Sequence, residues 1–88
     1  MCGIIGINSN KPVSSTIINS LKKLEYRGYD SAGIATLSGG LINEIKSEGR
    51  VDNLEKNSLV QSMKGTICIG HVRWATHGSP NSINAHPH

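Results

Sequence analysis

The 88-residue sequence has few aromatic side chains and no phenylalanine, which limits the core that it can build. Aromatic residues make up 3% of the chain and hydrophobic residues 36%. A domain of this length buries only about 60% of the surface that its unfolded chain exposes. The length therefore fits one small domain, and no internal repeat, low-complexity segment or linker divides the chain.

The sequence also lacks long apolar runs. No run approaches the roughly 20 residues that a membrane-spanning helix needs. The first residues lack the basic region of a secretory signal and soon reach the polar stretch Asn8–Lys11. We therefore expect a cytoplasmic protein that does not contact a membrane. In that compartment Cys2 and Cys68 are expected to be free thiols rather than a disulfide.

Charge of one sign is not concentrated anywhere in the chain. Nine Lys and Arg against six Asp and Glu give a net charge of +3, and the densest basic group is only Lys22, Lys23 and Arg27. Nucleic-acid binding would need a basic stripe with aromatic side chains or a known module. Neither is present, so we expect no nucleic-acid partner and interpret the charges as a solvated surface.

The hydrophobic pattern predicts alternating strands and helices. Cys2–Asn8 fits a short buried strand, and Ser14 or Ser15 offers an N-cap for a helix that ends before Gly28. The apolar positions of this helix fall on one face at helical spacing: Ile17, Ile18, Leu21 and Leu24. Two further strands, 31–37 and 41–46, flank a Ser38-Gly39-Gly40 turn that is typical of a hairpin.

The second half of the sequence has a weaker pattern. A helix is predicted over 51–63, with Val51, Leu54 and Leu59 as its apolar positions, and Gly65 should end it. A strand is then expected from Thr66 towards Val72. After Trp74 the glycine, proline and asparagine content predicts an irregular loop to the last residue.

Cys2 is the first candidate for chemistry. Methionine aminopeptidases remove Met1 when a small residue follows, and removal would place a thiol and a free α-amine on one residue. An α-amine has a reference pKa of about 7.7–8.0, so it is a usable proton acceptor at neutral pH. It could take the thiol proton and generate a nucleophilic thiolate. The alternative is that Cys2 is simply a small apolar residue at the start of a strand.

The segment 70–78 presents four functional side chains just after a predicted strand. Arg73 could hold a carboxylate through a bidentate, charge-assisted pair. Trp74 could form an apolar wall with one N–H donor, and Thr76 could add a hydroxyl hydrogen bond. An ordinary polar strand end would explain the same residues, and the sequence alone does not separate the two interpretations.

The remaining polar clusters are weaker candidates. Four histidines lie near the C-terminus, but their spacing, with Cys68, does not match a common zinc pattern, so we expect no metal. The stretch 26–33 follows the first predicted helix. Within it Arg27 and Asp30 could simply form a surface ion pair, a contact that contributes little stability.

Taken together, four blocks of the sequence resemble glutamine–fructose-6-phosphate aminotransferases, in that family's order. The Cys-Gly-Ile start is shared with other class II amidotransferases, and the Tyr-Arg-Gly-Tyr-Asp-Ser-Ala-Gly block narrows the resemblance to the hexosamine enzyme. The blocks are 1–6, 24–33, 70–78 and 84–88.

The resemblance implies an α+β chain that forms part of an N-terminal nucleophile (Ntn) hydrolase fold, a four-layer αββα sandwich. It implies hydrolysis of glutamine through a thioester on Cys2, with ammonia passed on for glucosamine 6-phosphate synthesis. By the same match Arg73 would bind the glutamine α-carboxylate, and the other pocket residues would be Trp74, Thr76, His77, Arg27 and His86. No cofactor is expected.

The sequence also departs from the family. Residues 2–88 correspond to the N-terminal part of the amidotransferase domain; the later Asn-Gly pair that supplies the oxyanion hole is absent, and so is the sugar-phosphate isomerase domain. Loss of one oxyanion donor costs on the order of 10²–10³ in rate. We therefore expect a truncated relative that is inactive alone. The alternative is a non-catalytic interaction module completed by a separately encoded remainder.

Overall fold

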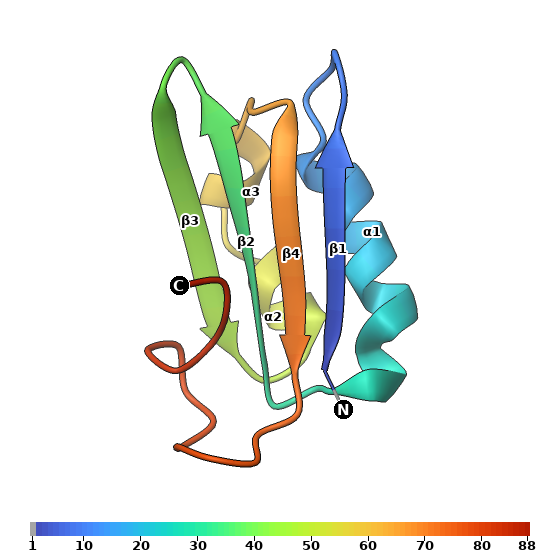
Figure 1. The fold of residues 1–88 in the computed structure, drawn as a ribbon, viewed down its shortest axis with the longest axis vertical. Helices are drawn as coiled ribbons and strands as arrows, with labels where there is room; N and C mark the ends of the chain where they lie inside the picture. Colours follow the sequence, from blue (N-terminus) through green and yellow to red (C-terminus); the bar gives the residue numbers. More distant parts are fainter. Residues whose placement is uncertain (1) are drawn as a thin grey trace.

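The computed structural model describes residues 2–88, which form one four-stranded antiparallel sheet with helices packed on one face (Figure 1). The strands lie in the order β1-β4-β2-β3, so the last strand in sequence is inserted between the first two. Their bounds are β1 Gly3–Asn8, β2 Ser31–Ser38, β3 Leu41–Glu48 and β4 Ile67–Arg73.

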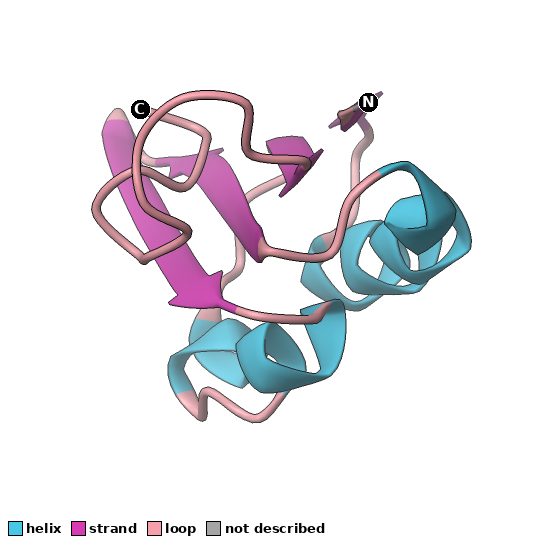
Figure 2. Cartoon of the chain, turned by 90° about the horizontal axis from the view of Figure 1, so that it is seen from below, coloured by secondary structure: helices cyan, strands magenta, loops and turns pink. Residues whose placement is uncertain are grey.

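The helical segments cover a single face of this sheet. Figure 2 shows the helices on one side and the loop that follows β4 on the other. The longest helix, α1, packs against β1 and β4, while α2 packs against β3 and β2. The helices are α1 Ser14–Leu24, a 3₁₀ turn η1 Glu25–Arg27, α2 Val51–Glu55 and α3 Leu59–Ser62.

The predicted stripe of α1 is confirmed. Ile17, Ile18 and Leu21 are fully buried against the sheet, and Leu24 is partly buried beside them. The start of the helix differs from the prediction, because Val13 occupies the N-cap position and no side chain caps the helix. Burial of the apolar stripe, rather than a capping serine, therefore fixes this helix on the sheet.

The hairpin between β2 and β3 is confirmed as well. Ser38 pairs with Leu41, so Gly39 and Gly40 form a two-residue turn. Both glycines have positive φ, 57° and 79°. A turn with positive φ at both central residues matches the right-handed twist of its strands and favours glycine at both positions.

The single helix predicted over 51–63 is wrong. The segment forms two short helices, because the Asn57 side chain accepts the backbone N–H of Leu59 at 3.0 Å and interrupts the helical hydrogen-bond pattern. Val51 and Leu54 are buried as predicted, but Leu59 is 61% exposed and Val60 enters the core in its place.

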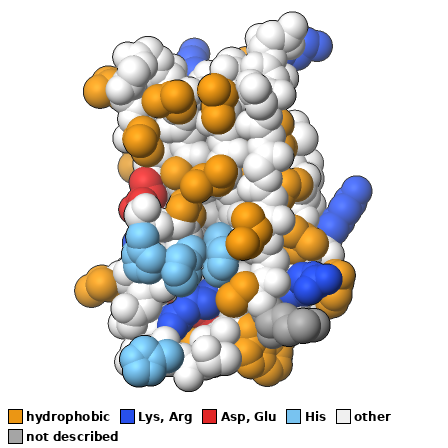
Figure 3. Space-filling view, in the orientation of Figure 1, with side chains coloured by type: hydrophobic (Ala, Val, Ile, Leu, Met, Phe, Trp, Pro, Cys, Tyr) orange, Lys and Arg blue, Asp and Glu red, His pale blue; other side chains and the backbone are white. Residues whose placement is uncertain are grey.

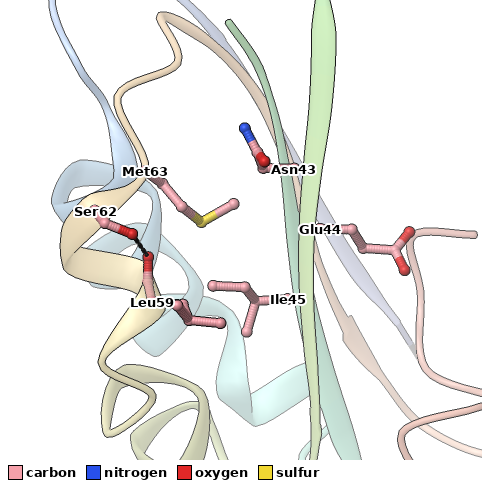
Figure 4. Close-up of a pocket in the computed structure, with 6 residues that line it drawn as sticks. All are labelled: Asn43, Glu44, Ile45, Leu59, Ser62 and Met63. Carbon is pink, nitrogen blue, oxygen red and sulfur yellow. Dashed lines mark hydrogen bonds between the residues drawn. The ribbon is translucent and has the colours of Figure 1, made fainter.

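A hollow of about 180 Å³ separates α3 from β3 (Figure 4). Ile45 and Met63 point into it, whereas the Glu44 side chain extends to the other side of the strand. The Ser62 hydroxyl donates to the Leu59 carbonyl at 2.8 Å, within α3 itself. The Asn43 amide lies on the same side of β3 as Ile45, but no ionisable side chain is directed inward, so this hollow is a packing gap rather than a site for chemistry.

The opposite face of the sheet carries no helix and is rich in apolar side chains. In Figure 3 hydrophobic side chains spread over this face, and a row of histidines crosses its lower part. The exposed apolar residues on it are Ile4, Leu37, Ile42, Ile67 and Ile69. The α+β class is thus confirmed, and the described residues supply one sheet and one helical layer of the expected sandwich. No helix within residues 2–88 is long and apolar enough to cross a membrane.

Candidate active site

The antiparallel pairing of β1 with β4 places Cys2 next to Arg73 and Trp74. Gly3 lies opposite Val72 in the register, so the residue before β1 meets the residues that end β4. Cys2 is exposed. Its sulfur lies 3.4 Å from the backbone nitrogen of Trp74 and 3.9 Å from the Trp74 carbonyl oxygen. Two segments far apart in sequence therefore meet at the predicted nucleophile.

The hydrogen bonds of the Cys2 sulfur within residues 2–88 involve only the Trp74 backbone. No imidazole or carboxylate of this part of the chain is bonded to it, so the sulfur lacks a side-chain base. The role of the Cys2 α-amine as base stays a prediction. Met1 lies outside the described residues, and its removal stays a prediction.

The 3₁₀ turn η1 brings Arg27 to the same corner. A β-carbon built on Gly3 would lie 3.4 Å from Cδ of Arg27, so the arginine stem packs against the residue that follows Cys2. Gly28 follows in an extended conformation, with φ 178°. A β-carbon there would lie 2.6 Å from the Trp74 nitrogen. Gly28 is therefore required by the close approach of two backbones and not by a left-handed helix end.

Arg73 is directed into the loop that follows β4. Its side chain is almost fully buried, and its guanidinium donates to the carbonyl oxygens of Ser79 at 3.0 Å, Gly78 at 3.4 Å, and His77. Asp30 lies 3.9 Å away and supplies the opposite charge. The arginine thus closes the loop on itself, and any carboxylate ligand would have to share its remaining N–H groups.

Trp74 and Tyr29 form an aromatic pair at the end of β4. Their rings meet edge to face with centroids 5.9 Å apart, and each side chain is 47% exposed. Together with Asp30 and Ala75 they line a hollow of about 310 Å³. The Arg50 guanidinium lies over the Tyr29 ring, 4.7 Å from its centre, at the distance of a cation–π contact.

The structure brings together only some of the predicted pocket residues. Cys2, Arg27, Arg73 and Trp74 meet at one end of the sheet. Thr76 and His77 lie exposed in the following loop, where His77 contributes its backbone carbonyl to Arg73.

His86 lies beside β4 on the open face. Its ring stacks on His71 with centroids 4.6 Å apart, and the His88 ring follows at 4.3 Å. Burial lowers the pKa of His71, and repulsion from His86 and Arg73 lowers it further. Burial likewise lowers the pKa of His86, with His88 and Arg73 adding to the effect. Both Nδ1 atoms are buried without a hydrogen-bond partner.

The second cysteine, Cys68, is buried and therefore unreactive. Cys68 faces α1 and is buried in the core cluster, and burial raises the pKa of its thiol to about 11. At neutral pH such a thiol stays protonated. Among residues 2–88 no group of three His, Cys, Asp or Glu side chains is placed to hold a metal ion.

No protein-family model matches the chain. Curated relatives do match it along all 88 residues: it is 56% identical to the glutamine–fructose-6-phosphate aminotransferase (isomerizing) of Bradyrhizobium diazoefficiens and 53% identical to that of Rhizobium meliloti. The chain is homologous to the N-terminal part of these aminotransferases. It spans 14% of the length of each of these relatives.

Solved structures of more distant proteins share the fold. The glutamine phosphoribosylpyrophosphate amidotransferase of Bacillus subtilis superposes with a TM-score of 0.83 at 28% identity, over 99% of this chain and 18% of that one. A structure described as the allosteric regulatory enzyme of purine biosynthesis gives a TM-score of 0.86 at 29% identity, again with 18% of its chain covered. The chain therefore has the fold of the N-terminal part of a class II amidotransferase domain.

Proposed function

We propose that residues 2–88 carry the nucleophile and part of the glutamine pocket of an aminotransferase that supplies ammonia for glucosamine 6-phosphate synthesis. The observation that supports this most is the exposed Cys2 sulfur beside the Trp74 N–H, at the corner where Arg27 and Arg73 also lie. The homology with glutamine–fructose-6-phosphate aminotransferases supplies the substrate.

In the proposed reaction the Cys2 sulfur attacks the amide carbon of glutamine. The α-amine of Cys2 takes the thiol proton and passes it to the departing nitrogen, so that ammonia leaves as the carbon–nitrogen bond breaks. Water then attacks the resulting thioester, glutamate is released, and the sulfur recovers its proton. Arg73 would hold the α-carboxylate of glutamine, with Trp74, Thr76, His77, Arg27 and His86 around it.

By itself, this chain is proposed to hydrolyse glutamine slowly or not at all. The oxyanion of the tetrahedral intermediate needs preorganised donors, and the sequence has no Asn-Gly pair to supply the donors that the resemblance implies. The Trp74 N–H is directed at the Cys2 sulfur, so it is not a free donor for the oxyanion.

Glutamate release from glutamine by the purified chain tests the proposal, with Cys2→Ala and Cys68→Ala as a matched pair. Any release should disappear in Cys2→Ala and persist in Cys68→Ala, since only Cys2 is exposed. Release that persists without the Cys2 thiol would contradict the assignment of the nucleophile. Intact mass shows in the same samples whether Met1 has been removed.

The open face of the sheet supports a second candidate, a non-catalytic interaction module. Ile4 and Ile42 are each 74% exposed there, and a hollow of about 190 Å³ on this face has almost purely apolar walls. An apolar face of this extent marks a protein interface. Its proposed occupant is the second sheet of the amidotransferase sandwich, on a separately encoded polypeptide.

Co-purification with a polypeptide made from the rest of a relative's amidotransferase domain separates the two candidates. Ile42→Lys should abolish capture, because it places a charge on the open face, whereas Leu59→Lys on the helical side should not. Equal capture by both variants would argue against this face as the interface.

A further inference from the structure

The geometry points to Asp30 as a positioning residue that holds the backbone of Trp74 and Ala75 so that the Trp74 N–H meets the Cys2 sulfur. This inference rests on the proposed role of Cys2 as nucleophile. Asp30 contacts neither the Cys2 sulfur nor the 3₁₀ turn's arginine through any hydrogen bond or ion pair of the described residues. It would therefore act on Cys2 indirectly, through residues 73–75.

The Asp30 carboxylate ties down the first residues of the loop. One oxygen accepts the backbone N–H of Ala75, and the other lies 3.9 Å from Nη1 of Arg73 and accepts the Ser31 hydroxyl at 2.9 Å. The carboxylate thus contacts residues on both sides of Trp74. The carboxylate holds the Trp74–Ala75 peptide directly through the Ala75 N–H, whereas its contact with Arg73 is with the guanidinium.

The backbone of Asp30 is anchored as firmly as its side chain. Its N–H donates to the Arg73 carbonyl at 3.2 Å, and its carbonyl accepts the Gly49 N–H at 2.7 Å. Gly28 extends the contact, because no side chain separates its backbone from that of Arg73 and Trp74. The stretch 28–31 therefore forms a rigid support under residues 73–75.

The consequence for Cys2 concerns the position of its sulfur. The Trp74 N–H is directed at the Cys2 sulfur, and this contact holds the sulfur in place at the corner of the sheet. The Trp74 nitrogen lies 3.4 Å from the sulfur, so its donor strength depends on its direction. A loop released from Asp30 would lose that direction, and Arg73 would lose its ion pair with Asp30.

Amide hydrogen exchange tests this directly and needs no substrate. Asp30→Ala should speed exchange at the Trp74 and Ala75 amides by roughly tenfold to a hundredfold, the effect of losing a hydrogen bond to a charged group. Exchange at Ile34, in the buried centre of β2, should stay unchanged. Asp30→Asn keeps an acceptor oxygen and should restore most of the protection. Asp52→Asn, on exposed α2, is the matched control and should have no effect on these amides.

The rate of Cys2 alkylation by iodoacetamide at neutral pH is the second readout. Asp30→Ala should slow it several-fold, Asp30→Asn should recover part of the rate, and Cys68 should stay unmodified in every variant. Unchanged exchange at Trp74 and Ala75, or equal acceleration at Ile34, would overturn the positioning role. An unaltered rate of Cys2 alkylation in Asp30→Ala would overturn it as well.

These outcomes are independent of glutamine hydrolysis. Exchange and alkylation that follow Asp30 while glutamate release persists in Cys2→Ala would overturn the proposed function and leave the positioning role standing. Cys2-dependent glutamate release with unchanged exchange would do the reverse.

Discussion

The Cys2 sulfur accepts the backbone N–H of Trp74 at 3.4 Å, although 72 positions separate the two residues in the sequence. The contact exists because β4 is inserted between β1 and β2, which brings the end of β4 to the start of β1. The sheet order is thus what assembles the candidate site, and the η1 turn and the 28–31 support complete it from the side.

Gly28→Ala tests the close approach of the two backbones. A methyl group at this position would press on the carbonyl of Arg73 and the nitrogen of Trp74, and neither can move without disturbing the loop. We expect a loss of about 1–3 kcal/mol in the free energy of unfolding. Urea denaturation measures it.

Gly6→Ala is the control for Gly28→Ala. A β-carbon at Gly6 would meet nothing closer than the Cys68 carbonyl oxygen at 4.0 Å. Its free energy of unfolding should be unchanged or slightly higher, since alanine restricts the unfolded chain more than glycine does. Equal losses in the two variants would show that the space around Gly28 is not tight.

Leu54→Ala and Leu59→Ala test the revised helix assignment. Leu54 is fully buried and Leu59 is 61% exposed, although both belong to the apolar pattern of one predicted helix. Leu54→Ala should cost about 2–5 kcal/mol of unfolding free energy. Leu59→Ala should cost less than about 0.5 kcal/mol, as is usual for exposed positions. Similar costs in thermal or urea unfolding would contradict the split into α2 and α3.

The contacting rings of His71, His86 and His88 predict that the stability of the protein depends on pH. Burial lowers the pKa values of His71 and His86 below the reference value of 6.5, so in acid the unfolded chain binds more protons than the folded one. The free energy of unfolding should therefore fall as the pH drops below about 6.5 and continue to fall towards the lowered pKa values.

The double variant His71→Gln/His86→Gln isolates this effect. It should show a flatter stability profile between pH 7 and pH 5, whereas His77→Gln, in the exposed loop, should keep the profile of the parent chain. Urea midpoints measured across this range give the comparison. A parent-like slope in the double variant would assign the pH dependence to other groups.

The sequence predicted the elements whose signal is local. The apolar stripe of α1 and the Gly39-Gly40 turn were both confirmed, because a helical period and a pair of positive-φ residues depend on neighbours in the chain. The break at Asn57 was missed, since one side-chain hydrogen bond to the Leu59 N–H outweighed a weak apolar period.

The partners of Asp30 could not be predicted. The sequence suggested a surface pair with Arg27, but the carboxylate contacts Arg73 and Ala75 instead. That contact depends on strand order, which nothing local to Asp30 encodes. Gly28 ends the 3₁₀ turn as its position predicted, but the close packing of its backbone against Trp74 also depends on strand order and could not be predicted.

The glutamine-binding roles of six residues stay predictions: Arg73, Trp74, Thr76, His77, Arg27 and His86.

Covalent labelling by a glutamine analogue with an electrophilic ketone in place of the amide tests the central claim most directly. The analogue needs a nucleophile and a pocket but no complete turnover. Peptide mass spectrometry locates the adduct and separates Cys2 from Cys68. We predict an adduct on Cys2 alone, slowed by added glutamine and lost in Cys2→Ala. No adduct on Cys2, or labelling that glutamine does not slow, would contradict a glutamine site built around this cysteine.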